Sequence, residues 1–284
     1  MSRGPLEATA KERISKELPD LSKLQDLVLR LSSDFLSINF TPESTVPEAS
    51  VCLNDALRTL GQAVYALSEV FAHQVWYLDK KDPPNKMAAV FFGLFYADDA
   101  ALRLYSAGEH LANGIILMLE ITDEDLQPYK KKGSRERISQ QSVVGHFLRE
   151  QKADHPITAA INKLIDSKKW CATMCYRNTW VHEQPPTVKG LGIIYKRKKN
   201  KTRWKPSLVG EGYTLKVGGG DVPEYSIKEL IRFIQPAMFQ FTDTLTSVVN
   251  FYMKLLEDSG GVRFNLKQEV NNMNKMPQLR VLRD

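Results

Sequence analysis

Apolar residues recur at helical spacing through most of the chain. From about Val51 to Leu78, they fall three or four residues apart and so share one helix face, at Leu53, Leu57, Leu60, Val64, Leu67 and Phe71. Two prolines at positions 83 and 84 end this segment, and a second long helix is predicted from about Lys86 to Glu120. Short connections of this kind favour antiparallel packing of neighbouring helices.

Shorter helices are predicted on both sides of this pair. The region up to about Phe40 is typical of a short charged helix followed by an amphipathic one, whose apolar residues are Leu21, Leu24, Leu27, Val28 and Leu31. Two more helices are predicted from about Ile138 to Arg149 and from Ile157 through Val181.

The pattern changes after residue 190, where Ile, Val, Tyr and Thr are broken by Gly and Asn. This composition predicts a small β-hairpin insert with strands at Leu191–Lys196, Thr202–Leu208 and Tyr213–Val217. Ser226 and Glu229 form a capping-box pattern, which predicts the start of a last long helix to about Glu257. The expected fold is therefore mainly α, an antiparallel helical bundle with the insert before its last long helix.

Three regions are expected along the chain. Residues 1–80 would form an N-terminal helical extension, and residues 81–258 the bundle, with the β insert at about 190–220. Residues 259–284 form a polar C-terminal tail that is either poorly ordered or docked elsewhere.

Composition narrows the class of protein. The 284 residues are 43% hydrophobic, which is ample for a core, but the longest uncharged stretch, from Met87 to Ala97, has 11 residues. A membrane-spanning helix needs about 20, so no membrane insertion is expected. The N-terminus has no apolar signal core, and three scattered cysteines fit a reducing compartment, so a cytoplasmic location is expected.

The positive charge is concentrated locally. The net charge is +6, and two basic runs stand out, one at 130–137 and one in the predicted hairpin. The hairpin run consists of Lys196, Arg197, Lys198, Lys199, Lys201, Arg203, Trp204 and Lys205. Cations around a stacking surface predict contact with nucleic acid. The alternative is a solvated edge hairpin, in which lysines prevent aggregation.

The strongest candidate for chemistry is Arg177-Asn178-x-x-x-His182, at the end of a predicted helix. Arginine suits phosphate, and histidine exchanges protons near neutral pH. Attack by the 2′-hydroxyl of RNA needs a base, an acid and positive charge on the phosphate. One histidine cannot comfortably be both base and acid, so this chemistry predicts a homodimer. The alternative is structural: Arg177 pairs with an acid, and His182 stabilises the helix C-terminus.

This motif resembles the R-N-x-x-x-H signature of the HEPN superfamily, and the apolar helix from Phe95 to Ile121 resembles that family's opening helix. The likeness extends over roughly residues 86–257. It implies a four- or five-helix bundle that dimerises with its two motifs at the interface. Many members are metal-independent endoribonucleases of toxin–antitoxin, CRISPR and abortive-infection (phage-defence) systems, while others are inactive and bind nucleotides or partner proteins.

Carried over from the family, Arg177 would bind the scissile phosphate of RNA, His182 would act as acid or base, and Asn178 would orient the site. The implied partners are RNA, a second copy of the chain and, in a toxin, an antitoxin. A non-catalytic dimeric module that binds nucleic acid, nucleotide or a partner protein is the alternative function.

The predicted second long helix carries a polar stripe of four residues, Asp99, Arg103, Ser106 and His110. If this stripe faces the motif, Asp99 would steer Arg177, His110 would supply a second imidazole, and neighbouring Glu109 is a further acidic candidate. Otherwise it is the solvated side, held by an Asp99–Arg103 pair.

No metal or cofactor is expected. Cys171 and Cys175 stand upstream of His182, but the sequence places no fourth zinc ligand. The two cysteines are therefore interpreted as buried apolar residues.

Overall fold

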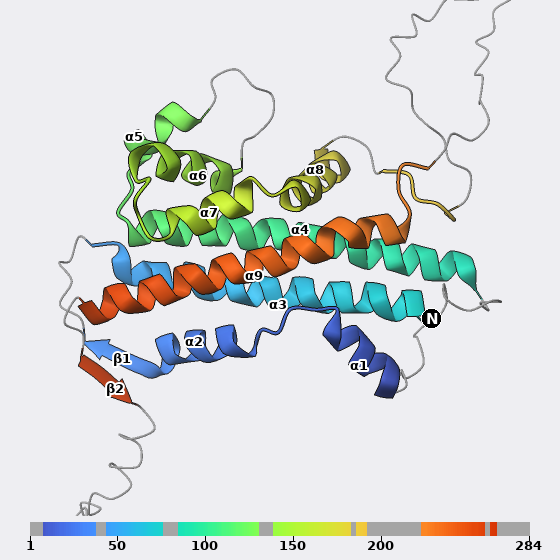
Figure 1. The fold of residues 1–284 in the computed structure, drawn as a ribbon, viewed down its shortest axis with the longest axis horizontal. Coiled ribbons are helices and arrows are strands. Elements are labelled where there is room, and N and C mark those ends of the chain that lie inside the picture. The colour runs from blue at the N-terminus through green and yellow to red at the C-terminus, as the bar shows by residue number, and fades with distance from the viewer. Residues whose placement is uncertain are drawn as a thin grey trace, which may run out of the picture.

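The computed structural model describes residues 8–37, 44–75, 85–130, 139–182, 186–191, 223–258 and 262–265. It is mostly helical, as predicted. Three long helices lie side by side along the molecule: α3 (Ala49–His73), α4 (Lys86–Met118) and α9 (Ile227–Asp258) (Figure 1). None of the described helices combines the length and the apolar character that crossing a membrane requires.

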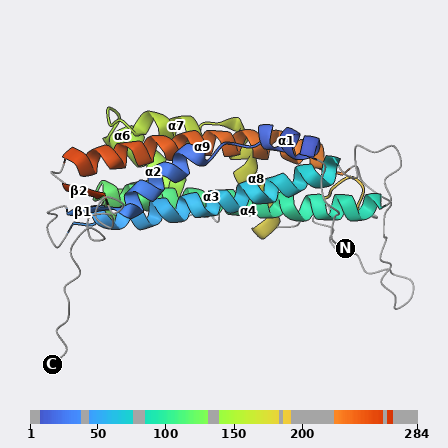
Figure 2. The ribbon, with the colours of Figure 1, turned by 90° about the horizontal axis from the view of Figure 1, so that it is seen from below.

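The α3–α4 pair forms the centre of the bundle, and the two helices run antiparallel (Figures 1 and 2). Small side chains on α4 are almost completely buried, which lets the helices approach closely; they are Ala97, Ala100, Ala101, Ala107 and Ala112. Leucines of α3, including Leu53, Leu60 and Leu67, fill the space opposite and are 0% exposed. The two long helices predicted from apolar spacing are thus confirmed.

The third long helix, α9, begins at the predicted capping box. The backbone N–H and the hydroxyl of Ser226 both donate to Glu229 Oε2, at 2.7 and 2.8 Å, and Glu229 N donates back to Ser226 Oγ at 3.3 Å. These contacts satisfy backbone donors that the first turn leaves free. At the far end of α9, the hydroxyl of Tyr252 donates to the carbonyl of Val46 in the short 3-10 helix η1 (Val46–Glu48).

Short helices cover this framework. α1 (Ala8–Lys16) and α2 (Ser22–Ser33) pack on α3. α5 (Asp123–Leu126), the 3-10 helix η3 (Gln127–Tyr129) and α6 (Gln140–Gln151) follow α4 in the chain. α7 (Thr158–Ile165) packs on α9, and α8 (Lys168–His182) packs on both α4 and α9. One apolar core cluster includes Leu24 of α2, Leu60 of α3 and Leu245 of α9, so the first 80 residues contribute to the same core as the rest.

The single helix predicted from Ile157 through Val181 is wrong, because the structure divides it into α7 and α8. Ser167 causes the break: its hydroxyl accepts from Trp170 N at 3.3 Å, an N-cap contact that starts a new helix. Beside it, both carboxylate oxygens of Asp166 accept hydrogen bonds from Arg149 Nη2, Oδ1 at 2.9 Å and Oδ2 at 2.8 Å. The break lets α8 leave the direction of α7 (Figure 1), and α8 packs on α4.

The β structure that is described lies where the sequence did not indicate it. β1 (Asp34–Ser37) pairs antiparallel with β2 (Val262–Asn265), so the end of α2 meets the chain beyond α9. The prediction treated both segments otherwise, the first as part of a helical region and the second as part of a polar tail. Apart from Leu191, the residues of the three predicted hairpin strands lie outside the described residues.

Candidate functional site

Helix α8 carries the Arg177–His182 motif and is anchored to the bundle through one face. The ring of Trp170 stacks on Phe241 of α9 at 5.5 Å between centroids, with an interplanar angle of 6°. One turn later, the buried hydroxyl of Thr173 lies 2.9 Å from the carbonyl oxygen of Lys169 in α8 and 3.3 Å from that of Phe233 in α9, so its one hydrogen is shared between them. These contacts fix α8 against α9, so the other face of α8 is held over α4.

A buried polar pair fixes α8 to α4 directly before the motif. The hydroxyl of Tyr176, which is 2% exposed, donates to the carboxylate of Asp98 on α4. Burial raises the pKa of Asp98 to about 6, although the hydrogen bond from Tyr176 acts in the opposite direction. Burial and the neighbouring carboxylate raise the pKa of Tyr176. Tyr176 also meets Tyr225 edge to face at 5.5 Å.

The structure brings the three motif residues together. Arg177 Nη1 donates to Asn178 Oδ1 at 3.0 Å and lies 3.3 Å from His182 Nε2. The guanidinium also stacks on the ring of Tyr105 from α4, 3.8 Å from its centroid. Arginine only donates hydrogen bonds, so in this contact the ring nitrogen of His182 can serve only as the acceptor. His182 itself is exposed at the end of α8.

Glu109 of α4 lies within electrostatic range of this cluster. Its Oε2 accepts from Gln140 N, at the first residue of α6, at 3.3 Å. The side chain of Ser139 makes no cap hydrogen bond, so the carboxylate of Glu109 caps α6 from the neighbouring helix. Burial raises the pKa of Glu109, and the N–H groups of α6 and the charge of Arg177 oppose that rise.

Several buried polar atoms around Arg177 have no hydrogen-bond partner among the described residues. They are Arg177 Nε, Glu109 Oε1 and Gln141 Oε1. One is a donor and two are acceptors, and such atoms are usually satisfied in folded proteins. The junction of α4, α6 and α8 therefore offers unused hydrogen-bonding capacity beside the motif.

The predicted polar stripe of α4 does not face the motif. Asp99 pairs with Arg103 at 3.1 Å, and Arg103 Nη1 donates to Gln62 of α3 at 2.6 Å. Ser106 donates to the carbonyl of Leu102 within α4. His110 is half-buried, and it adds a small contribution that lowers the pKa of neighbouring Glu109. The structure agrees with the alternative interpretation, in which the stripe lies toward the surface and is held by the Asp99–Arg103 pair.

The α4 side chains that meet α8 lie one position earlier. Asp98 contacts Tyr176, Tyr105 contacts Arg177, and Glu109 senses the charge of Arg177. Sequence reasoning missed Asp98 and Tyr105. The available signal was spacing: Asp98 and Tyr105 are seven residues apart, and Tyr105 and Glu109 are four apart. Residues with these spacings share one helix face.

Other predicted sites are placed differently. The basic residues from Lys196 to Lys205 lie outside the described residues. Cys171 and Cys175 are exposed, which corrects their interpretation as buried apolar residues; four residues apart on α8, they share its outer face. Within the described ranges, no group of three or more His, Cys, Asp or Glu residues is arranged to hold a metal ion.

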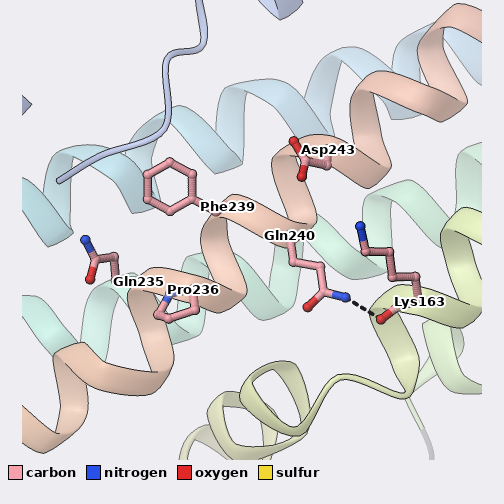
Figure 3. A pocket seen from close by; sticks show the side chains of 6 residues that line it. All are labelled: Lys163, Gln235, Pro236, Phe239, Gln240 and Asp243. Atoms are coloured by element: carbon pink, nitrogen blue, oxygen red, sulfur yellow. Dashed lines mark hydrogen bonds between the residues drawn. The ribbon is translucent and has the colours of Figure 1, made fainter. Parts of the chain in front are cut away.

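A surface hollow of about 400 Å³ lies away from the motif, between α7 and α9 (Figure 3). The amide of Gln240 there donates to the carbonyl of Lys163. The hollow is open to solvent. Its lining includes the ring of Phe239 and one charge of each sign, from Lys163 and Asp243. The motif cluster therefore remains the candidate site. Comparisons with protein-family models, curated proteins and solved structures found no significant match.

Proposed function

We propose that the chain is a HEPN-like, metal-independent endoribonuclease whose active site is shared by two copies. The observation that carries the proposal is the motif geometry: Arg177 is held beside Asn178 and His182, and His182 is exposed. RNA is the proposed substrate because its 2′-hydroxyl supplies the nucleophile.

The roles follow from the charges. The neutral His182 of one copy takes the proton of the 2′-hydroxyl as that oxygen attacks the adjacent phosphorus. His182 of the second copy, in its protonated form, donates to the leaving 5′-oxygen. The products are a 2′,3′-cyclic phosphate and a free 5′-hydroxyl. Arg177 stabilises the extra negative charge on the phosphate oxygens in the transition state.

An apolar face of α4 beside the motif supports docking of a second copy. Met87, Phe91 and Phe95 are 65%, 55% and 57% exposed, which is unusual for such large side chains. Phe91, Asp98 and Tyr105 are seven residues apart, so the apolar face continues the face of α4 that meets α8. Val181 within the motif is 42% exposed as well. Pairing through this face would bring the two motifs together.

The test is cleavage of end-labelled single-stranded RNA by the purified chain in excess EDTA. The wild type is expected to cut, and His182→Ala is expected to lose about 10²–10⁴-fold in rate, the usual contribution of an acid–base group. His146→Ala is the matched control, because His146 is exposed on α6 outside the cluster. Cleavage that EDTA stops, or equal rates for both variants, would contradict the proposal.

A non-catalytic module is the second candidate, and the contacts of Arg177 favour it. Arg177 is already bound by Tyr105, Asn178 and His182, as a structural arginine would be. In that case Arg177→Ala weakens assembly or binding of RNA, and the wild type has no turnover to lose. A toxin held by an antitoxin would instead be toxic on overexpression, and His182→Ala would abolish the toxicity.

A further inference from the structure

A groove with no part in the proposed RNA chemistry lies between α1, the end of α3 and the start of α9. Its cavity volume is about 280 Å³, close to the lower end of the range for small-molecule sites. None of its lining residues belongs to the motif or to the α4 residues around Arg177. Three helices far apart in the sequence thus form one concave surface.

The groove has an excess of positive charge. Among the described lining residues, Arg13 of α1 and Lys228 and Arg232 of α9 are positively charged, and Glu17 is the single acid. The carboxylate of Glu17 accepts from Gln235 Nε2 at 2.8 Å. A concave site with excess positive charge concentrates anions, and guanidinium groups suit carboxylates and phosphates in particular.

An apolar surface lies directly beside these cations. Phe71 lines the groove, is half-buried and supplies more of this surface than Ile14 and Ile231, which at 6% and 8% exposed add only small patches to it. Such a surface takes up the apolar body of a ligand, because water leaves both surfaces on contact. The combination of cations and apolar side chains favours an amphipathic organic anion over an inorganic one.

The side-chain amide of Gln74 favours a ligand that carries a hydrogen-bond donor. Gln74 lines the same groove, and its carbonyl oxygen is buried without a hydrogen-bond partner among the described residues. A buried acceptor that lacks a donor is unfavourable. The terminal torsion of a glutamine is soft, so a small rotation presents this oxygen to a donor on a ligand.

We infer that this groove binds a small aromatic acid that carries a ring N–H. The anionic group lies between Arg13 and Arg232, the ring lies over Phe71 and Ile231, and the N–H donates to Gln74. This site is independent of the ribonuclease proposed above.

Three matched probes test the inference by calorimetry or ligand-observed NMR on the full chain. Indole-3-acetate has all three features, and a Kd of about 1 mM or tighter is expected for a ligand of its size. Naphthalene-1-acetate keeps the shape and charge but lacks the N–H, and is expected to bind about three- to tenfold more weakly. Indole-3-acetamide lacks the charge and is expected to bind about tenfold more weakly or worse.

Variants assign the binding to the groove. Arg13→Gln and Arg232→Gln are each expected to weaken indole-3-acetate binding about tenfold. Gln74→Met should remove the difference between the indole and naphthalene probes. Arg58→Gln, on an exposed part of α3 where Arg58 pairs with Asp55, is the control and should change nothing, as should Arg177→Ala. Circular dichroism checks that each variant is folded.

The inference is overturned if indole-3-acetate does not bind at millimolar concentration. It is also overturned if both groove arginine variants, shown to be folded, bind it as the wild type does. Equal affinities of the two acids would overturn the assignment of Gln74.

Discussion

At the residue scale, Asp98 makes stability depend on pH. Burial raises its pKa to about 6 in the folded chain, against an ordinary value of 3.8. Between these values the folded chain keeps a proton that the unfolded chain has lost, so the free energy of unfolding falls as pH rises. The loss is complete above about pH 6 and amounts to at most about 3 kcal/mol.

Asp98→Asn is therefore expected to flatten this dependence, because its amide oxygen still accepts from Tyr176 without carrying a charge. Urea unfolding at pH 4.5 and pH 7.5 measures the effect. The variant should be more stable than the wild type at the higher pH. Asp243→Asn, at an exposed position of α9, is the control. Parallel pH profiles for the wild type and Asp98→Asn would contradict the assignment.

Tyr105 is the second prediction at this scale, because its ring supports the guanidinium of Arg177. Replacing the ring in Tyr105→Leu is expected to cost about 0.5–2 kcal/mol of stability, the range for cation–π contacts. It should also slow RNA cleavage, since Arg177 is less well positioned. Tyr105→Phe keeps the ring and should behave like the wild type in both assays. An equal loss in the two variants would show that the hydroxyl, and not the ring face, is what matters.

At the element scale, two glycines in long helices should respond oppositely to alanine. A Cβ at Gly108 of α4 would lie 2.1 Å from Gln141 Oε1 and 3.2 Å from Trp170, so α6 and α8 could not keep their approach to α4. Gly108→Ala is expected to destabilise by about 1–3 kcal/mol through overpacking. Gly61 of α3 has nothing within 4 Å, so Gly61→Ala should stabilise by roughly 0.5–1 kcal/mol.

Thermal or urea unfolding of both variants gives the comparison. Destabilisation by Gly61→Ala, or stabilisation by Gly108→Ala, would show that the packing of α4 differs from the description given above. Adding Gln141→Ala to Gly108→Ala should recover part of the lost stability, because the nearest obstructing atoms belong to that side chain.

The same scale shows what the sequence could and could not predict. Apolar spacing and the prolines that interrupt it identified α3 and α4, and the Ser226–Glu229 pattern located the start of α9 correctly. The break at Ser167 was missed, because a single serine between two helical patterns competes only weakly in the sequence. The pairing of β1 with β2 joins segments more than 200 residues apart, which local patterns do not encode.

For the candidate site, sequence predicted the motif cluster but not its surroundings. The proximity of Arg177 and His182 follows from their spacing on one helix. Which face of α4 meets α8 depends on how the two helices cross. A shift of one position replaces Asp99 and Ser106 with Asp98 and Tyr105. Tertiary packing decides that shift.

At the scale of the whole molecule, the three long helices form a framework that holds α8 through Trp170, Tyr176 and Arg177. His182 lies at the exposed end of α8, and the proposed function requires that a second copy and an RNA strand both reach it there. The exposed apolar face around Phe91 and Phe95 continues the side of α4 on which Asp98 contacts Tyr176 of α8. The central claim, a shared ribonuclease site, therefore concerns an assembly of two chains.

The most direct measurement of that claim is the chemistry of the RNA ends. The purified chain is incubated in EDTA with an RNA and with the same RNA carrying 2′-deoxy sugars at the cleaved positions. The account predicts 2′,3′-cyclic phosphate and 5′-hydroxyl ends on the first RNA and no cleavage of the second. Cleavage of the 2′-deoxy substrate, or 5′-phosphate ends, would contradict it.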